Sequence, residues 1–498
     1  MGKKHICVIG AGPGGLSAAM LLSYKGYRVT LLEKASRVGG RNSGFELGKY
    51  HFDAGPTFLM MSFILKELFH EAGRNIEDYL DLIKLSPMYK LNFPDVILHT
   101  SQDKIKLQEE INHFFPGNEH SIARFFKRES SRYDHMYPCL QKPYSKFSAF
   151  LSKDFIRAIP HLSLTRSLYA LLSTYFNNEH LRVAFTFQSK YLGMSPWECP
   201  GAFSIIPYIE YAYGIDHVKG GLHRISHAME KVAREEGADI RLSTPVKKII
   251  TDTKTRTVGG VVLENGESVQ ADAVVIGSDF GYSMQSLFED GFLKKWKPSV
   301  LRDKKRFSCS TFMLYLGLNK LYNEPHHQII FSKDYKDNLD RIVKHQKLGN
   351  DYSFYVRNAS ITDSTLAPKG HSALYVLVPV SNRKDLLEWD ENEKAEFRKQ
   401  TLEIIKKRTS MTDIEKHIVQ EKIVTPADWE ARYNVFLGAT FNLGHNLRQM
   451  LYFRPRNSFE EAKRCYLVGG GTHPGSGLPT IFESARITSK LIEKQIPL

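Results

Sequence analysis

Three glycines near the start of the chain and one acidic residue beyond them have the types and spacing to bind a dinucleotide. Gly10, Gly12 and Gly15 stand in G-x-G-x-x-G spacing. They lie in the run Gly10-Ala11-Gly12-Pro13-Gly14-Gly15. The first glycine permits a tight turn, the second lets the backbone approach a pyrophosphate, and the third lets a helix pack on a strand. Glu33, 18 positions after Gly15, can accept a hydrogen bond from a ribose hydroxyl, so the pattern predicts dinucleotide binding rather than an unrelated glycine-rich turn.

The flanking residues predict the strand and the helix that such a loop requires. Residues 6–9 form an apolar run typical of a buried parallel strand, and Ala18 and Ala19 follow on a helix whose first amides would face phosphate charge. Gly26 ends this helix, and residues 29–32 form a second strand that leads into Glu33. This order is much more specific for a dinucleotide than the glycines are alone.

A second pair of glycines follows the acid. Residues 37–41 read R-V-G-G-R, directly after Glu33 and Lys34. This continuation resembles the extended fingerprint of the FAD-dependent amine oxidase and carotenoid desaturase superfamily. The resemblance implies FAD rather than NAD, with Glu33, Lys34, Gly40 and Arg41 among the residues that bind it. Arg41 would then place a positive charge near the phosphates or the flavin, and the alternative is a solvated surface arginine.

Two further segments are expected at the cofactor. The sequence turns from a strand end at Phe52 into the loop of Gly55, Pro56 and Thr57. In the resembling superfamily the corresponding D-x-G-P segment passes near the flavin ring. A strand is predicted over residues 246–250, and the resemblance implies that backbone groups near Val246 meet the adenine side of FAD.

The C-terminal residues repeat the order of strand, glycine loop and helix. Residues 465–468 predict a strand, and a helix is predicted from about Thr480 to Lys494. The loop between them contains the candidate cofactor residues Gly471, Thr472, His473, Gly477, Leu478 and Pro479. Such a unit can cover an isoalloxazine ring and point a helix N-terminus at its pyrimidine edge. His473 could lie beside the reacting carbon or be a hydrogen-bonded loop histidine, and we favour the loop role.

The composition is that of a large globular protein with a basic charge balance. The 498 residues are 42% hydrophobic and 12% aromatic, with a net charge of +14. This length predicts several domains or one large interleaved unit, and the charge favours an anionic partner, either nucleic acid or acidic lipid, unless the protein is simply basic. Five scattered cysteines predict neither a zinc site nor a disulfide framework, and hence a reducing cytoplasm. We expect no signal peptide and no spanning helix.

One stretch combines bulky apolar residues with positive charge. Residues 142–176 are rich in Phe, Leu, Ile and Tyr and carry five basic residues against one acid. Basic residues that flank aromatic and aliphatic ones suit the headgroup boundary of a membrane. The alternative is an ordinary pair of amphipathic helices whose apolar side is core. The sequence alone favours neither.

The two ends of the chain and its middle together resemble the bacterial-type phytoene desaturase family, the carotenoid desaturases. The resemblance rests on VIGAGPGGLSAA, LLEKASRVGGR and FDAGPT near the start, LVGGGTHPGSGLP near the end, and residues 203–240. A narrower match within the family is carried by residues 55–57, 187–193, 219–221, 452–455 and 472–475. Gly470 departs mildly from the usual alanine. Thr472 and His473 favour the desaturases over the carotenoid oxygenase branch.

The resemblance implies an α/β fold in which two bodies are interleaved. A Rossmann-like FAD-binding domain would comprise residues 1–75, 200–285 and 425–498. An α+β substrate-binding domain would comprise residues 76–199 and 286–424, with a membrane-facing helical part near 142–176. The protein would be cytoplasmic and peripherally associated with the inner face of the cell membrane.

The implied activity is an FAD-dependent desaturation that introduces conjugated C=C bonds into an acyclic isoprenoid carotenoid precursor. An apolar tunnel, drawn from residues 104–200 and 290–380, would hold this hydrophobic substrate. We assign no catalytic base, no metal, no nucleic-acid partner and no oligomeric state. The alternatives are a carotenoid oxygenase or isomerase of the same family, an amine oxidase, or a non-enzymatic escort of prenylated proteins. The sequence shows no polar cage for an amine, and the intact glycines with Glu33 argue against the escort.

Overall fold

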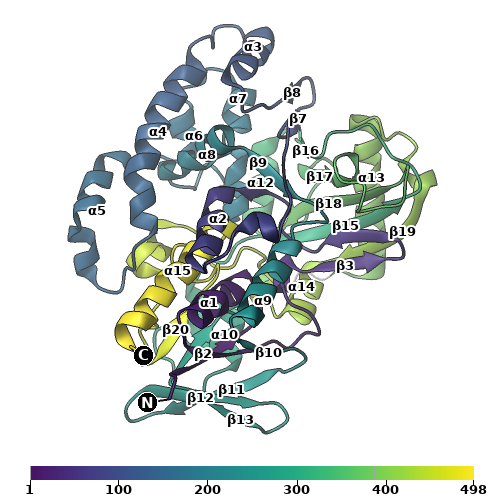
Figure 1. The fold of residues 1–498 in the computed structure, drawn as a ribbon. Helices are drawn as coiled ribbons and strands as arrows, with labels where there is room; N and C mark the ends of the chain where they lie inside the picture. Colours follow the sequence, from purple (N-terminus) through teal and green to yellow (C-terminus); the bar gives the residue numbers. More distant parts are fainter. Residues whose placement is uncertain (1, 386–388) are drawn as a thin grey trace.

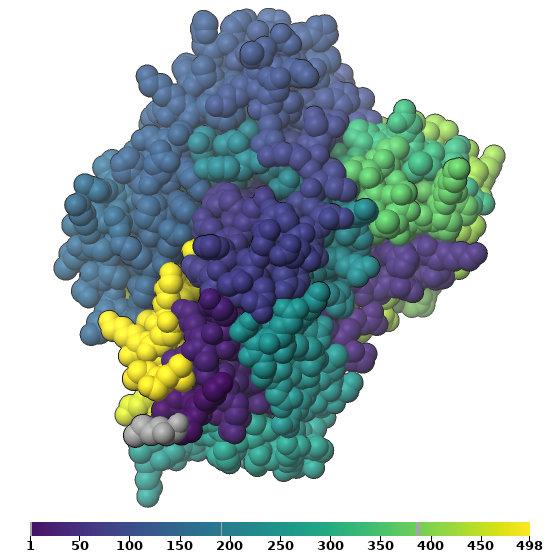
Figure 2. All heavy atoms as spheres, in the orientation of Figure 1, coloured from purple at the N-terminus to yellow at the C-terminus, as the bar shows by residue number. Residues whose placement is uncertain are grey.

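The computed structural model describes residues 2–385 and 389–498. A parallel sheet built from three distant parts of the chain lies in the lower part of the molecule in Figure 1. The strand order is β10-β2-β1-β14-β20, and every neighbouring pair is parallel. The strands are β1 (His5–Ile9), β2 (Arg28–Leu32), β10 (Asp239–Arg241), β14 (Ala273–Ile276) and β20 (Cys465–Leu467). The two ends of the chain therefore meet in one sheet, as the purple and yellow atoms in contact in Figure 2 show.

Both faces of this sheet are covered, which explains its almost continuous apolar strands. Ile6 and Val8 of β1 point into one core with the helices, whereas Cys7 and Ile9 point into a second core on the other face. The helices on the first face are α1 (Pro13–Tyr24), α9 (Arg224–Glu235), α15 (Leu478–Gln495) and α2 (Ser62–Glu71). The antiparallel strands β11 (Val246–Asp252), β12 (Thr257–Leu263) and β13 (Ser268–Gln270) cover the second face, beside α10 (Phe280–Ser286) and α11 (Pro298–Lys304).

A second sheet, of seven strands, forms the adjoining body. Its order is β19-β15-β18-β17-β16-β7-β8, antiparallel except between β16 and β7. The strands are β7 (Lys90–Asn92), β8 (Ile97–His99), β15 (Ser310–Leu318), β16 (His327–Ile330), β17 (Phe354–Asn358), β18 (Ser372–Val380) and β19 (Ile418–Val424). Alternate residues of β15 face opposite sides: Phe312 and Leu314 pack against α13 (Glu391–Arg408), whereas Met313 and Tyr315 join the central core.

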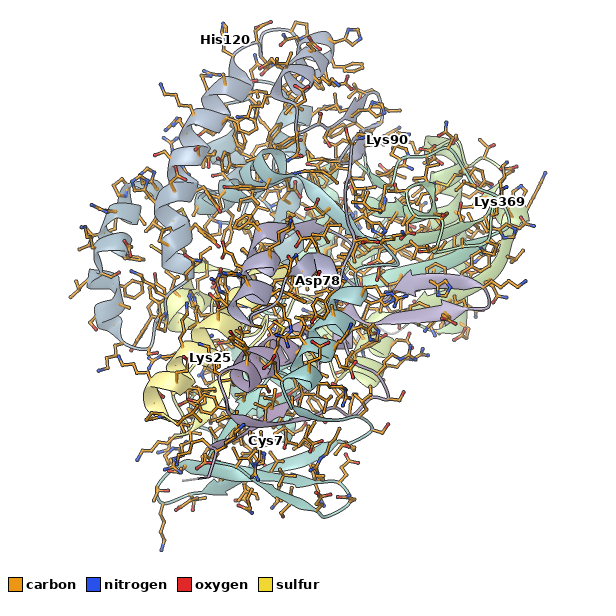
Figure 3. The ribbon with its side chains drawn as sticks, viewed as in Figure 1. Cys7, Lys25, Asp78, Lys90, His120 and Lys369 are labelled. Carbon is orange, nitrogen blue, oxygen red and sulfur yellow. The ribbon has the colours of Figure 1, made fainter. Side chains whose placement is uncertain are left out.

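Helices and short strands complete the molecule beside and above the two sheets (Figure 1). The helices are α3 (Lys104–Phe114), α4 (Ser121–Leu140), α5 (Lys153–Ala158), α6 (Leu168–Leu172), α7 (Glu179–Ala184), α8 (Ile205–Tyr213), α12 (Tyr335–Val343) and α14 (Pro426–Tyr433). The short strands are β3 (Gly44–Leu47), β4 (Tyr50–Asp53), β5 (Leu59–Met60), β6 (Leu82–Lys84) and β9 (Ile215–Val218). In Figure 3, Lys90 on β7 lies between the helical part that carries His120 and the turn that carries Lys369, just before β18.

The predicted fold class is confirmed, since a Rossmann-like parallel sheet is interleaved with a second α+β body. The predicted domain limits stay predictions. Strand β19 ends at Val424, next to the proposed limit at 425, but β9, within the proposed FAD-binding domain, pairs with β6, which lies outside it. Among the described residues no helix is long and apolar enough to cross a membrane.

Residues 142–176 form short helical pieces with two different environments, and not the pair of amphipathic helices that was one of the two alternatives. Up to Leu164 the large apolar side chains are mostly at the surface, whereas Leu168, Leu172 and Phe176 are buried in the central core. Ser152 and Ser167 each accept a hydrogen bond from a backbone N–H at the start of a short helix, and Pro160 lies between the two. These local signals divide the stretch: its second half packs as core, its first half leaves apolar side chains at the surface, and the membrane contact stays a prediction.

Candidate functional site

A single cavity of about 1080 Å³ reaches from the glycine loop of the parallel sheet to the inner face of the second sheet. Its wall includes Gly12 and Glu33 from the first body and Met313 and Leu377 from the second. The volume is at the top of the range of about 300–1,000 Å³ for a pocket that holds one small molecule. The cavity can therefore hold an extended cofactor and part of a second molecule.

Close backbone packing shapes the glycine-rich end of the cavity. A Cβ atom at Gly15 would lie 2.0 Å from the Gly10 carbonyl oxygen, and one at Gly14 would lie 3.0 Å from the Gly469 amide nitrogen. Gly15 thus lets α1 pack on β1, and Gly14 lets the two ends of the chain meet. Gly12, by contrast, lines the cavity, and a Cβ added there would have no neighbouring atom closer than 4.0 Å. This difference leaves space for a pyrophosphate at Gly12.

Two helices begin at the cavity wall. Helix α1 starts after Gly12 and helix α15 after Gly477, and residues of both first turns line the cavity. The first amides of a helix have no acceptor within it, and the helix dipole adds partial positive charge there. The cavity therefore offers two positions that favour an anionic or electron-rich group.

Glu33 is held rigidly at the cavity wall. One carboxylate oxygen accepts a hydrogen bond of 2.7 Å from the Ala11 amide, and the other accepts one of 2.8 Å from the Ala35 amide. An ionised carboxylate has further lone pairs for two hydroxyl donors. The sequence predicts that Glu33 contacts a ribose, and the free lone pairs of its carboxylate are available for that contact.

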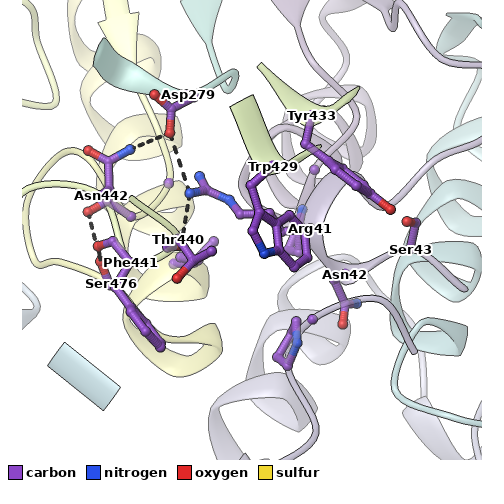
Figure 4. A pocket seen from close by; sticks show the side chains of 18 of the residues that line it. Arg41, Asn42, Ser43, Asp279, Trp429, Tyr433, Thr440, Phe441, Asn442 and Ser476 are labelled. Carbon is purple, nitrogen blue, oxygen red and sulfur yellow. Dashed lines mark hydrogen bonds and ion pairs between the residues drawn. The ribbon is translucent and has the colours of Figure 1, made fainter. Parts of the chain in front are cut away.

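Arg41 lies inside the site and is not a solvated surface residue (Figure 4). Its guanidinium donates a hydrogen bond of 3.0 Å to the Thr440 carbonyl and lies 3.4 Å from an Asp279 carboxylate oxygen. The Asn442 side-chain amide donates a 2.8 Å hydrogen bond to the same oxygen of Asp279. Burial raises the pKa of Asp279, and the charge of Arg41 opposes that shift.

Unpartnered polar atoms in the wall test whether a polar cofactor fits. The Thr440 hydroxyl and the Asn42 side-chain oxygen are buried and have no hydrogen-bond partner among the described residues, although both residues line the cavity. Buried polar groups in native proteins usually have a partner. Together with the two helix starts, these atoms are suited to a ligand with many hydroxyl, phosphate and amide groups, as FAD has.

Most predicted cofactor residues come together in this wall. Those that line it are Gly10, Gly12, Pro13, Gly14, Glu33, Lys34, Gly40, Arg41, Gly55, Pro56, Thr57, Val246, Gly471, Gly477, Leu478 and Pro479. Ala11, Gly15, Thr472 and His473 do not line it. Ala11 orients Glu33 through its amide, and Gly15 is covered by the Gly10 carbonyl.

Thr472 and His473 do not line the cavity, and their predicted contact with the cofactor stays a prediction. The Thr472 hydroxyl donates to the Pro455 carbonyl at 2.6 Å. His473 is 1% exposed, its ring centre is 5.0 Å from that of Tyr144, and burial lowers its pKa to about 3. Arg454, fully buried, donates to the Thr472 and Gly470 carbonyls at 2.9 and 2.6 Å. These contacts fix the shape of the glycine loop.

The second half of the cavity is mainly apolar and aromatic. Because side chains alternate along strands, it is the odd-numbered residues of β15 and β18 that reach it. Its lining includes Phe58, Phe187, Met313, Ile329, Phe354, Tyr355, Tyr375, Leu377 and Pro379. The ranges expected for the tunnel, 104–200 and 290–380, contain all of these residues except Phe58.

A buried ionic network, also missed, lies behind the loop of Gly55. Arg357 on β17 donates a 2.7 Å hydrogen bond to one oxygen of Asp53, and His223 makes 2.8 Å contact with the other. Arg357 and the His223 contacts lower the pKa of Asp53 despite its burial. Arg357 also lies 3.2 Å from His217, which contacts Asp363 at 2.9 Å. In the sequence, the only sign of this network is the polar pair Arg357-Asn358 at the end of an otherwise apolar run.

Comparison with known proteins gives one consistent result. The family described as flavin containing amine oxidoreductase matches residues 13–492. A 4,4'-diapophytoene desaturase (4,4'-diapolycopene-forming) of Methylomonas sp. is 47% identical, over 99% of this chain and 96% of its own. A 4,4'-diapophytoene desaturase (4,4'-diaponeurosporene-forming) of Staphylococcus haemolyticus is 33% identical over 99% of both chains. An oxidoreductase structure from Methanosarcina mazei shares the fold, with a TM-score of 0.65, 16% identity, and coverage of 98% of this chain and 100% of its own.

Proposed function

This chain belongs to the carotenoid desaturases of the flavin-containing amine oxidoreductase family, and from that premise we propose that it desaturates 4,4'-diapophytoene. The products would be of the diaponeurosporene or diapolycopene type. The observation that carries the proposal is the continuous cavity, whose one end is a dinucleotide cradle and whose other end is apolar. A hydrocarbon has no polar group to recognise, so the shape of the apolar half must select it.

The cofactor is FAD, and when bound it supplies the hydride acceptor of the desaturation. The residues suited to hold it are Glu33 at the ribose, the first turn of α1 at the pyrophosphate, and the loop and first turn of α15 at the flavin. Arg41, fixed by Asp279 and Thr440, would add positive charge beside them. The protein's further part is to orient the isoprenoid chain and keep water from the reacting carbons.

The activity is tested by expressing the protein in cells that make 4,4'-diapophytoene and recording pigment spectra. We expect absorption of conjugated polyenes to appear at longer wavelengths as double bonds are added. Oxygenated products would instead indicate a carotenoid oxygenase, and a rearranged product with no new double bond an isomerase. A purified protein that is colourless and takes up no FAD would favour a non-enzymatic escort.

We also propose that the surface around α5 lies on the membrane that holds the substrate. Phe147, Leu151, Ile156, Ile159 and Leu164 are each more than half exposed. The exposed basic residues Lys142, Lys146, Lys153, Arg157 and Arg166 lie in the same segment. Aromatic and aliphatic side chains with a basic rim suit the boundary of an anionic bilayer. In Figure 1 α5 stands at the outer edge of the molecule.

Replacing Phe147 and Leu151 by serine is expected to reduce flotation with anionic liposomes several-fold. Each change removes an exposed apolar side chain that would enter the interface. Ile105→Ser is the matched control, because Ile105 is 71% exposed but lies on α3, outside the surface around α5. Equal flotation of both variants, or wild-type protein that stays unbound at low salt, would contradict the proposal.

A further inference from the structure

We propose that the amine of Lys190 accepts the proton that leaves the substrate during desaturation. The inference deepens the proposed function and rests on it. Lys190 lines the cavity within the turn Phe187–Leu192, beside Phe187 and Cys309. Lys190 is a basic side chain in the half of the cavity whose wall is otherwise mainly apolar and aromatic.

The amine of Lys190 is unpaired among the described residues. Its Nζ atom has neither a hydrogen bond nor a carboxylate within ion-pair distance there. Its defined contact is with the Tyr335 ring of α12, whose centre is 4.7 Å from Nζ. Lys190 is partly buried, and its contact with the Tyr335 ring favours the ammonium, whereas the apolar wall favours the neutral amine. A neutral amine has a lone pair that can take a proton.

The backbone around Lys190 is fixed against the wall that leads to the C-terminal glycine loop. Gly193 ends the turn in a left-handed conformation, and a Cβ there would lie 2.3 Å from the Cβ of Ser308. The Ser308 hydroxyl accepts a 3.0 Å hydrogen bond from the Phe441 amide. Phe441 in turn lines the cavity together with Ser476, and the Ser476 hydroxyl donates to the Phe441 carbonyl. Lys190 thus belongs to the junction between the apolar half and the glycine loop.

The ionisation of the neighbouring groups agrees with this role. Burial lowers the pKa of Lys190 to about 7. Burial also raises the pKa of Cys309, on the strand side, to about 12, and raises that of Tyr335, on the helix side, still further. Neither neighbour is a base at neutral pH. Glu33 and Arg41 lie toward the cradle, whereas Lys422 also lines the cavity, with its Nζ atom 4.0 Å from the centre of the Phe45 ring, and burial lowers its pKa as well.

The proposed step balances in atoms and electrons. One C–H bond of the saturated C–C unit would break, and its electron pair would leave with the hydrogen as hydride, for which a bound FAD would supply the acceptor. The C–H bond on the neighbouring carbon then breaks, its proton forms an N–H bond with Lys190, and its electron pair becomes the new π bond. The resulting ammonium releases the proton to water before the next cycle.

The test compares Lys190→Met and Lys190→Arg with the wild type in product formation from 4,4'-diapophytoene. Methionine has no basic nitrogen, and arginine stays protonated, so both are expected to lose on the order of 10²-fold in rate. The wild-type rate should rise with pH through about pH 7, where the amine becomes neutral, and the variants should lack this rise. Lys336→Met is the matched control, because Lys336 lies over Trp197 in the same way but outside the cavity wall.

A second readout does not depend on turnover. Competitive acetylation of the protein over a pH series, followed by peptide mass spectrometry, reports the pKa of the Lys190 amine. A midpoint near 7 supports the proposal, and one near the ordinary lysine value of about 10.4 overturns it. Active Lys190 variants with an unchanged pH profile would overturn it as well. A wild type that forms no desaturated product would instead overturn the proposed function, which separates the two failures.

Discussion

Replacing Gly12 by alanine is expected to yield a protein that folds normally but has lost most of its FAD. The Gly12 backbone has φ −71°, which alanine adopts readily, and no atom lies closer than 4.0 Å to the added Cβ. The Cβ would instead occupy the space through which the backbone approaches the pyrophosphate. We expect the dissociation constant for FAD to rise at least about tenfold, or about 1.4 kcal/mol, measured by flavin titration of the apoprotein.

Gly15→Ala separates the cofactor role of Gly12 from a role in folding. Its Cβ would lie 2.0 Å from the Gly10 carbonyl oxygen, so the helix must move from the strand. Such overpacking costs about 1–3 kcal/mol or more, and the thermal unfolding midpoint of the apoprotein should fall. The prediction fails if Gly12→Ala binds FAD as the wild type does, or if it lowers the unfolding midpoint as much as Gly15→Ala.

Replacing Arg357 by methionine is expected to destabilise the protein by about 3–5 kcal/mol, because it leaves the Asp53 carboxylate buried without its cation. Asp53 and Arg357 are each 3% exposed and are joined at 2.7 Å. The loop of Gly55, Pro56 and Thr57 follows Asp53 directly and lines the cavity. FAD binding should therefore weaken together with stability. Urea unfolding of the apoprotein at neutral pH measures the loss.

The loss should depend on pH in a defined direction. The pKa of Asp53 is lowered in the folded protein, so its contribution is complete above the unfolded value of about 3.9 and is lost as the pH falls through the folded value. The difference between wild type and Arg357→Met should therefore shrink on acidification. The double variant Asp53→Asn/Arg357→Met removes the charge and should regain part of the stability. No recovery, or a difference that grows in acid, would contradict this account.

The cradle for the cofactor was largely predictable because its signals are local. The first predicted strand and helix occur as β1 and α1, and the helix expected after the last glycines occurs as α15. Helix α14 likewise begins at a local signal, since Pro426 is its first residue and Thr425 and Asp428 form a reciprocal capping pair. These features depend on residues a few positions apart. Spacing of glycines, alternation of apolar residues and capping residues are sufficient to define them.

The interior of the second sheet was less predictable. Strands β16 and β17 were missed, since both are short and carry polar residues such as His327 and Arg357. Their polarity is explained by partners far away in the chain, because Arg357 meets Asp53 across 304 positions. A strand pattern cannot reveal such a pair, since the polar residue looks like a break in the strand until its partner is known.

The sequence by itself therefore determined a dinucleotide cradle near the N-terminus, a strand, glycine loop and helix near the C-terminus, the α/β class and the family. Only the tertiary structure decided which side chains reach the cavity. It turned Thr472 and His473 away, brought Arg41 inside, and placed Lys190 in the cavity wall beside Phe187 and Cys309. The physical reason is that local geometry follows from neighbouring residues, whereas the orientation of a side chain toward a cavity depends on how distant segments pack around it.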